Sequence, residues 1–136
     1  MGYRAVMARV PLVLVADRSR LASNLYKLIF APLGINLLLR RSCEQALDYL
    51  KKGGAADLLI VSSNSVGPEG SSLIERLSSV SSDRGIAKIF ICRESSSDDG
   101  LRLMFASIPG SILLKRPFHP DEMLGLVRGC LKGGAA

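Results

Sequence analysis

The chain has 136 residues, of which 48% are hydrophobic, and a formal net charge of +6 at pH 7. This length allows one domain with a core of its own, and the hydrophobic content excludes a disordered chain. No apolar run reaches the roughly 18 residues of a membrane-spanning helix, and none near the start is long enough for a signal-peptide core. We therefore expect one cytoplasmic domain over 1–136 without a membrane partner, with a core of about 11–132 and flanks at 1–10 and 133–136.

The positive charge raises the question of nucleic-acid binding. The 18 Lys and Arg residues are spread along the chain, aromatic residues make up 5%, and no RNA-stacking motif is present. Three cysteines, Cys43, Cys92 and Cys130, lack metal-ligand spacing and cannot form a closed disulfide framework. We expect reduced thiols, no metal site and no nucleic-acid partner.

The first predicted strand is the apolar run Pro11–Ala16. Helical spacing begins at Ser19 and stops at Pro32–Gly34, before a second strand over Ile35–Leu39. The apolar residues of this first helix share one face, which predicts that the face is buried: Leu21, Leu25, Leu28 and Ile29.

The second predicted helix opens with Ser42 and Gln45, which form a capping-box signal, and ends at Gly53–Gly54. Its apolar stripe contains Cys43, Ala46, Leu47 and Leu50. The third strand, Leu58–Val61, is a short apolar run bounded by polar residues, which is typical of a strand buried on both faces.

Ser72 and Glu75 give a second capping-box signal, for a helix that ends in the polar segment 81–85. Its apolar stripe contains Leu73, Ile74, Leu77 and Val80. Ile86–Cys92 is the fourth predicted strand. A loop rich in Ser and Asp then leads into a short helix, whose apolar residues are Leu101, Met104, Phe105 and Ile108.

Gly110–Leu114 is the fifth predicted strand, and Pro120 occupies the first position of the last helix. That helix has the apolar stripe Met123, Leu124, Val127, Cys130 and Leu131. The final Gly-Gly-Ala-Ala is expected to be the start of a linker or simply the chain end.

Strands that alternate with helices predict a parallel sheet with right-handed crossovers, in a three-layer α/β/α sandwich of the flavodoxin-like type. In this fold the carboxyl ends of the strands meet at one edge of the sheet. Asp17, Ser62, Cys92 and the pair Lys115–Arg116 follow or end four of those strands. We expect them to surround one shallow pocket.

From about Pro11 to Leu131 the chain resembles the receiver domain of two-component response regulators, the CheY-like family. The loop after the third strand has the family's spacing, with Gly67 and Gly70 in place and Glu69 as its acidic residue. The fifth strand leads into Arg116-Pro117-Phe118, where the family has Lys-Pro-Phe. The resemblance implies the strand order 2-1-3-4-5 and a cis bond between Arg116 and Pro117.

The chain departs from the family at the positions that carry its chemistry. Ala16-Asp17 replaces an acidic pair, and Ser62 replaces the aspartate that accepts phosphate. Cys92 stands where the family has Thr or Ser, and Arg116 stands for its lysine. The resemblance therefore implies a degenerate phosphorylation pocket, in which we expect Mg²⁺ to bind weakly or not at all because carboxylate ligands are missing.

The remaining chemistry of this pocket has several interpretations. A serine hydroxyl is a weak nucleophile without a base, and Cys92 has no histidine beside it, since His119 is expected to cap the last helix. We expect no enzyme and no cofactor. Arg116 is expected to pair with Asp17, although the cations there can also form an anion site: Arg18, Arg93, Lys115 and Arg116.

The resemblance favours a signalling module that acts by protein contact without being phosphorylated. The expected partners are a histidine kinase, an output domain or a second copy, bound through the fourth helix, fifth strand and last helix. The residues of that face are Arg102, Phe105, Ile112, Leu113 and Arg128, and Leu113 replaces the family's aromatic switch residue. The alternatives are a phosphate-responsive regulator with Ser62 as acceptor, or a sensor of anions or nucleotides.

Overall fold

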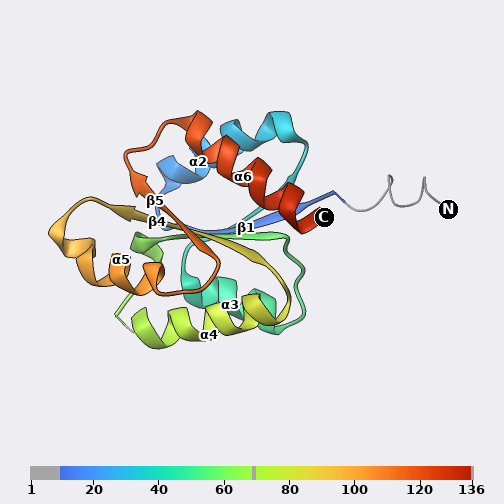
Figure 1. The fold of residues 1–136 in the computed structure, drawn as a ribbon. Helices are drawn as coiled ribbons and strands as arrows, with labels where there is room; N and C mark the ends of the chain where they lie inside the picture. The colour runs from blue at the N-terminus through green and yellow to red at the C-terminus, as the bar shows by residue number, and fades with distance from the viewer. Residues whose placement is uncertain (1–9, 69, 136) are drawn as a thin grey trace.

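The computed structural model describes residues 10–68 and 70–135. They contain a parallel sheet of five strands in the order β2-β1-β3-β4-β5 (Figure 1). The strands are β1 Leu12–Ala16, β2 Asn36–Arg40, β3 Leu58–Ser62, β4 Ala87–Arg93 and β5 Ser111–Arg116. The predicted fold class and strand order are confirmed.

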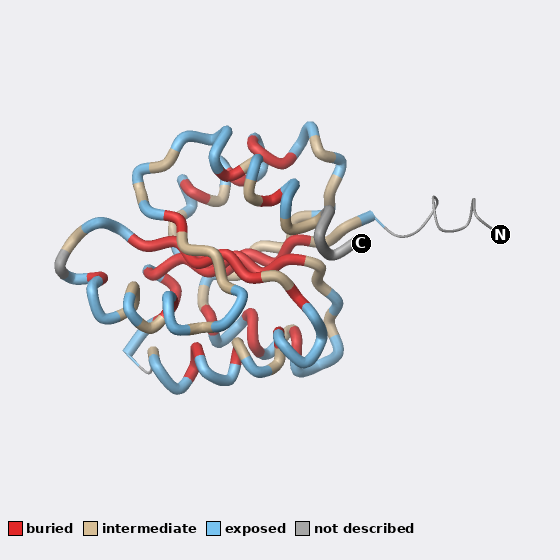
Figure 2. Tube along the Cα trace, viewed as in Figure 1, coloured by how far each residue is buried: buried red, intermediate tan, exposed pale blue. Residues whose placement is uncertain are grey.

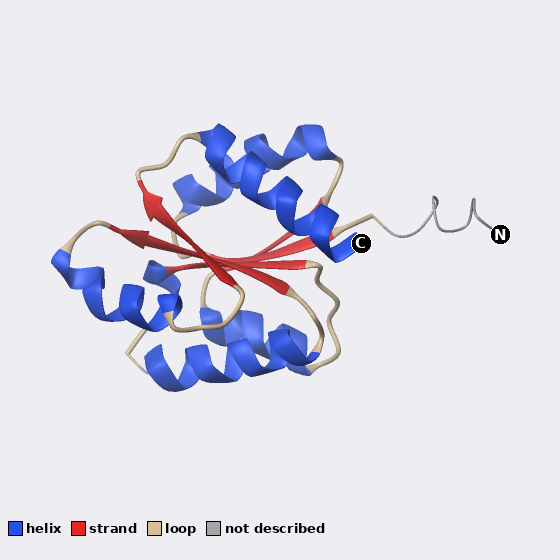
Figure 3. Ribbon diagram, viewed as in Figure 1, coloured by secondary structure: helices blue, strands red, loops and turns tan. Residues whose placement is uncertain are grey.

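A helix follows each strand, so every connection returns the chain to the same edge of the sheet. The helices are α2 Arg20–Phe30, α3 Cys43–Lys51, α4 Gly70–Asp83, α5 Asp99–Ala106 and α6 Pro120–Ala135. Helices α2 and α6 cover one face of the sheet, and α3, α4 and α5 cover the other (Figures 1 and 3). Short 3₁₀ turns lie at Ala31–Leu33, Ser63–Ser65 and Ser96–Asp98.

Two hydrophobic cores lie on the two faces of the sheet, and β3 contributes to both. Leu59 and Val61 face α3, α4 and α5, whereas Leu58 and Ile60 face α2 and α6. All five residues of β3 are buried, as predicted for a central parallel strand. Figure 2 shows this buried centre between helices whose outer surfaces are exposed.

The predicted buried face of α2 is wrong for its three leucines, whereas Ile29 is buried as predicted. Leu21 is 81% exposed and Leu28 is 74% exposed, and Leu25 is exposed as well. The buried residues are Ala22, Tyr26, Ile29 and Phe30. They have the same helical spacing as the predicted set, with each member displaced by one position along the chain. Periodicity alone allows either stripe, and the larger aromatic side chains fill the core.

Two predicted helix boundaries also need correction. Helix α4 begins at Gly70, so Ser72 lies inside it and does not cap its first turn, and the helix continues to Asp83. Helix α6 runs to Ala135 and includes most of the predicted tail. The other predicted caps are confirmed: Ser42 Oγ accepts the Gln45 N–H at 3.1 Å, and His119 Nδ1 accepts the Asp121 N–H at 3.1 Å.

The loop after β3 contains Gly67 at φ +72°, a left-handed conformation that favours glycine. This agrees with the glycine spacing noted in the sequence. Glu69, predicted as the acidic residue of that loop, lies outside the described residues, as do residues 1–9 of the predicted flank. Within the described ranges no helix combines the length and apolarity needed to span a membrane.

Candidate functional site

The carboxyl ends of the strands bring together the polar residues predicted to share a pocket. Ala16, at the end of β1, is in register with Val61 of β3. The next residue along each of these strands, Asp17 and Ser62, therefore lies at the same edge of the sheet. Cys92 of β4 is in register with Lys115 of β5, and Arg116 ends β5. The site therefore lies at the carboxyl edge, where α/β sheets commonly bind ligands.

Asp17 is the centre of this site, and its side chain is completely buried. Its Oδ1 accepts hydrogen bonds from the Ser19 N–H at 2.9 Å and from Asn64 Nδ2 at 2.8 Å. Its Oδ2 accepts from the Tyr26 hydroxyl and from Arg116 Nη2, each at 2.7 Å. We call Asp17, Tyr26, Asn64 and Arg116 the Asp17 cluster. Four donors satisfy the buried carboxylate.

Arg116 supplies the positive charge of the Asp17 cluster. The predicted ion pair with Asp17 is present at 2.7 Å, and Nη2 also lies 3.1 Å from the Tyr26 hydroxyl. The guanidinium lies over the Phe118 ring, 5.9 Å from its centroid. The predicted cis bond to Pro117 is present. This guanidinium therefore neutralises the one carboxylate of the predicted pocket.

Tyr26 is protonated in this arrangement. Burial raises the pKa of its hydroxyl well above the usual value, and the adjacent Asp17 carboxylate raises it further. The hydroxyl donates to Asp17 and accepts from Arg116, so both of its roles are used. It links the Asp17 carboxylate to the Arg116 guanidinium, whose buried Nε has no hydrogen-bond partner among the described residues.

Ser62, the last residue of β3, is only 2% exposed. Its carbonyl accepts a hydrogen bond from Ser65 Oγ at 2.7 Å, and Ser65 Oγ lies 3.3 Å from the sulfur of Cys43. These contacts fold the 3₁₀ turn after β3 back over the end of the strand. Ser65 therefore anchors this turn both to the backbone at the end of β3 and to the first turn of α3.

A second buried carboxylate, Asp98, lies near the ends of β3 and β4. It accepts from Ser63 Oγ at 2.7 Å, from the Arg93 N–H at 2.8 Å and from Arg93 Nη2 at 3.4 Å. Burial opposes ionisation, but these donors outweigh it and hold the pKa of Asp98 below its usual value. Asp98 ties the loop after β4 to the turn after β3.

No protein-family model matches the chain, and no curated protein matches it in sequence. Solved structures do match. A response regulator receiver protein from Sinorhizobium medicae superposes with a TM-score of 0.76 at 19% identity, over 93% of this chain and 98% of the other. The fold is that of a CheY-like receiver domain.

Other solved structures with this fold occur in different contexts. The signal receiver domain of an HD domain-containing protein from Pseudomonas fluorescens has a TM-score of 0.75 at 20% identity, over 93% and 98% of the two chains. An adenylate cyclase from Rhodopirellula baltica gives 0.75 at 15% identity, over 93% and 90%. Identities this low establish the receiver fold and nothing finer.

The receiver fold implies a Mg²⁺ site at this edge, and the residues present do not fit one. Mg²⁺ requires oxygen ligands in a near-octahedral shell. Ala16 contributes only a methyl group, and Ser62 is neutral. Both oxygens of Asp17 already accept two hydrogen bonds each, one of them from a guanidinium. A divalent cation would have to displace Arg116.

The predicted anion site is also largely neutralised. Arg93 pairs with Asp98 at 3.4 Å, Lys115 pairs with Glu94 at 3.7 Å, and Arg116 pairs with Asp17. The Arg18 side chain is exposed, and its backbone N–H donates to Asn64 Oδ1 at 2.8 Å. Three of the four predicted cations thus have a carboxylate partner within the chain.

Cys92 is fully buried at the edge of this site. Burial raises the pKa of its thiol to about 11, and the Asp98 carboxylate adds to the effect. The thiol is therefore protonated near neutral pH and is a poor nucleophile.

The predicted interaction face is only partly available. Phe105 is completely buried and stacks on Phe90, with the ring centroids 4.3 Å apart, so it belongs to the core and not to the surface. Leu113 packs against the same core, and Ile112 packs against the other. Arg102 is paired with Asp99, and Arg128 is exposed. Phe105 was wrongly predicted to lie on the interaction face, because its ring faces the apolar core.

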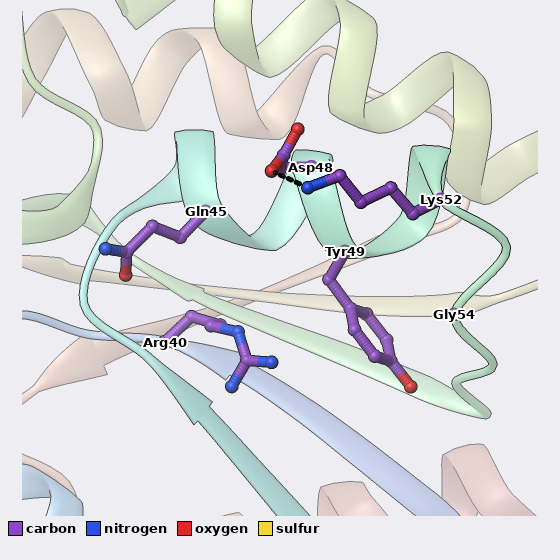
Figure 4. Close-up of a pocket in the computed structure, with 6 residues that line it drawn as sticks. All are labelled: Arg40, Gln45, Asp48, Tyr49, Lys52 and Gly54. Carbon is purple, nitrogen blue, oxygen red and sulfur yellow. Dashed lines mark ion pairs between the residues drawn. The ribbon is translucent and has the colours of Figure 1, made fainter.

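A separate hollow of about 490 Å³ lies beside the edge strand β2 and α3 (Figure 4). Its residues interact with one another: the Arg40 guanidinium lies 5.5 Å from the centroid of the Tyr49 ring, and Lys52 pairs with Asp48 at 3.0 Å. The Tyr49 hydroxyl donates to the Ala55 carbonyl at 2.7 Å. This hollow adjoins the strand-end site, because Arg40 ends β2 and its carbonyl accepts the Asp17 backbone N–H at 2.9 Å.

The sequence reasoning missed three residues of the strand-end site: Tyr26, Asn64 and Asp98. Tyr26 was missed because the leucine face of its helix was predicted to be the buried one. Asn64 lies two residues after Ser62, in a turn whose shape the residue spacing does not specify. Asp98 lies in a loop with several similar polar residues, and nothing in its local pattern distinguishes it.

Proposed function

We propose that this protein is a receiver-fold signalling module that works by protein–protein contact and takes no phosphoryl group at the strand-end pocket. The observation that carries the proposal is the Asp17 cluster. The Arg116 guanidinium pairs with the buried Asp17 carboxylate at 2.7 Å, at the edge of the sheet where a receiver binds metal and phosphate. The Asp17 carboxylate therefore has all its partners within the chain.

The chemistry of acceptor and metal supports the same conclusion. Phosphoryl transfer depends on positioned charges that stabilise the transferred group. Here the acceptor position is a buried serine, and Asp17, the carboxylate of the cluster, makes four hydrogen bonds and is not free to act as a base. Both the Ser62-acceptor alternative and the anion-sensor alternative would have to break ion pairs that the folded chain already makes.

The exposed leucines of α2 are the surface we assign to partner contact. Leu21, Leu25 and Leu28 form one stripe along the helix, where an apolar patch is otherwise unfavourable. Helix α2 contains Arg20 and Lys27 but no Asp or Glu. A second copy would bring like charges together, so the charge favours an acidic partner with its own apolar stripe. The α5–β5–α6 face predicted from the sequence remains a second surface to test.

The first experiment tests the phosphorylation claim. The purified protein is incubated with acetyl phosphate and Mg²⁺, and separately with a phosphorylated histidine kinase, and its intact mass is measured. We expect no phosphoryl adduct. A stable adduct that disappears in Ser62→Ala would instead establish the substitute-acceptor function.

The second experiment tests the contact surface. Proteins retained from native extract by the wild type are identified, purified and measured pairwise against the Leu21→Ser/Leu28→Ser variant. We expect an acidic partner whose binding is lost in this variant and kept in the control Leu103→Ser, which changes an exposed leucine on α5. Equal binding to both variants would contradict the assignment to α2.

A further inference from the structure

A groove of about 330 Å³ lies between α4 and α5. These two helices are neighbours on one face of the sheet (Figure 1). Its volume is at the lower end of the range of small-molecule sites, about 300–1,000 Å³. One wall is apolar and includes Met104, Ile108 and Pro109. The other wall carries hydroxyl groups of α4, among them Ser78 and Ser82.

Lys88 lies behind the hydroxyl wall and is only 5% exposed. Its Nζ donates to Ser82 Oγ at 3.2 Å and to the Ile86 carbonyl at 3.5 Å. Among residues 10–68 and 70–135 it has no carboxylate as an ion-pair partner. Burial alone lowers the pKa of this lysine. A buried cation without a counter-ion is costly unless something else compensates its charge.

Ser78 provides a buried hydroxyl without a hydrogen-bond partner in the described part of the chain, in addition to the uncompensated charge of Lys88. Its Oγ is buried and has no hydrogen-bond partner among the described residues, whereas Ser81 Oγ donates back to the Leu77 carbonyl at 2.7 Å. Ser78 and Ser82 lie one helical turn apart, so their side chains share a face of α4. Since Ser82 Oγ accepts from Lys88, its own proton is free to donate. The wall thus has two hydroxyl donors with an ammonium behind them.

We propose that the α4–α5 groove is a binding site for a small carboxylate with an apolar body. The carboxylate oxygens accept from the hydroxyls of Ser78 and Ser82, and the Lys88 ammonium compensates the charge. The carbon chain lies against Met104, Ile108 and Pro109. This site is at the amino end of β4, at the opposite edge of the sheet from the Asp17 cluster, and it does not depend on the proposed function.

A monoanion fits this groove better than a phosphate dianion. The wall provides a single positive charge, and Glu75 also lines the groove. A second negative charge would be left uncompensated beside that carboxylate. An uncharged analogue would lose the interaction with Lys88, and an acid without an apolar body would leave the opposite wall uncovered.

The test is a titration of the full chain with hexanoate, followed by amide NMR. We expect saturable shifts at residues of the groove, and at least about a tenfold weaker affinity in Lys88→Met, because the positive charge that compensates the carboxylate is lost. Ser78→Ala should weaken binding as well. The matched control is Lys52→Met, which removes an exposed lysine on α3 and should bind hexanoate like the wild type.

A methionine side chain is nearly as long as that of lysine and carries no charge to bury, so we expect Lys88→Met to fold. Its thermal unfolding checks this. The proposal is overturned if hexanoate gives no saturable shift in the wild type. It is also overturned if Lys88→Met binds as tightly as the wild type, or if hexanamide or inorganic phosphate binds as tightly as hexanoate.

Discussion

Arg116 decides what the strand-end site can do. A guanidinium has a fixed charge and several donors, and here one of its nitrogens contacts both Asp17 and Tyr26. The sequence predicted this ion pair from two facts, namely that Asp17 follows the first strand and that Arg116 ends the fifth. It did not predict Tyr26 or Asn64, because a hydrogen bond between side chains depends on helix rotation and loop shape, which residue spacing does not specify.

Replacing Arg116 by Met is expected to reduce the free energy of unfolding by about 3 kcal/mol, because it leaves a buried carboxylate without its counter-charge. Urea unfolding at neutral pH measures the change. The matched control is Lys115→Met, which removes the neighbouring cation from an exposed pair with Glu94 and should cost less than about 1 kcal/mol. Equal losses in the two variants would contradict a structural role for the buried pair.

Asp98 gives the stability a dependence on pH. Because its pKa is lower in the folded state than in the unfolded state, its contribution is complete at neutral pH and is lost as the pH falls through the folded pKa. We expect the urea midpoint of the wild type to fall more steeply than that of Asp98→Asn between about pH 5 and pH 2. Parallel curves would show that the carboxylate has equal pKa values in the two states.

At the scale of elements, α2 shows where periodicity stops being informative. Its sequence contains two stripes with helical spacing, and the stripe with Tyr26 and Phe30 is the buried one. Leucine is apolar wherever it lies, so the leucine stripe looked equally suitable for the core. The helix caps were easier to predict, since Ser42 and His119 act on adjacent backbone groups and need no tertiary information. Ser72 had the same signal but lies within α4, because that helix starts two residues earlier.

Leu21→Ser/Leu28→Ser should leave the free energy of unfolding within about 0.5 kcal/mol of the wild type, since both side chains are exposed. Ile29→Ala, on the buried stripe of the same helix, should cost about 3 kcal/mol. Chemical unfolding of the three proteins compares them directly. A large loss in the serine variant would mean that the leucine stripe packs within the chain.

At the scale of the whole molecule, alternation of strand and helix was enough to predict the three layers and the parallel sheet. The order β2-β1-β3-β4-β5 then places the ends of β1, β3 and β5 at one edge, so residues 99 positions apart come into contact, as Asp17 and Arg116 do. What the sequence could not supply is the balance of charge at that edge. Asp98 and Glu94 pair with two of the cations that would otherwise form an anion site.

The central claim is that the strand-end pocket is closed from within and does not bind a phosphoryl group with its metal. The most direct measurement is amide NMR of the full chain during titration with beryllofluoride and Mg²⁺. An ordinary receiver domain that retains its aspartate and acidic pair serves as the positive control. We predict no saturable shifts at Asp17, Ser62 or Arg116 in this protein. Saturable shifts centred on Ser62 would contradict the account.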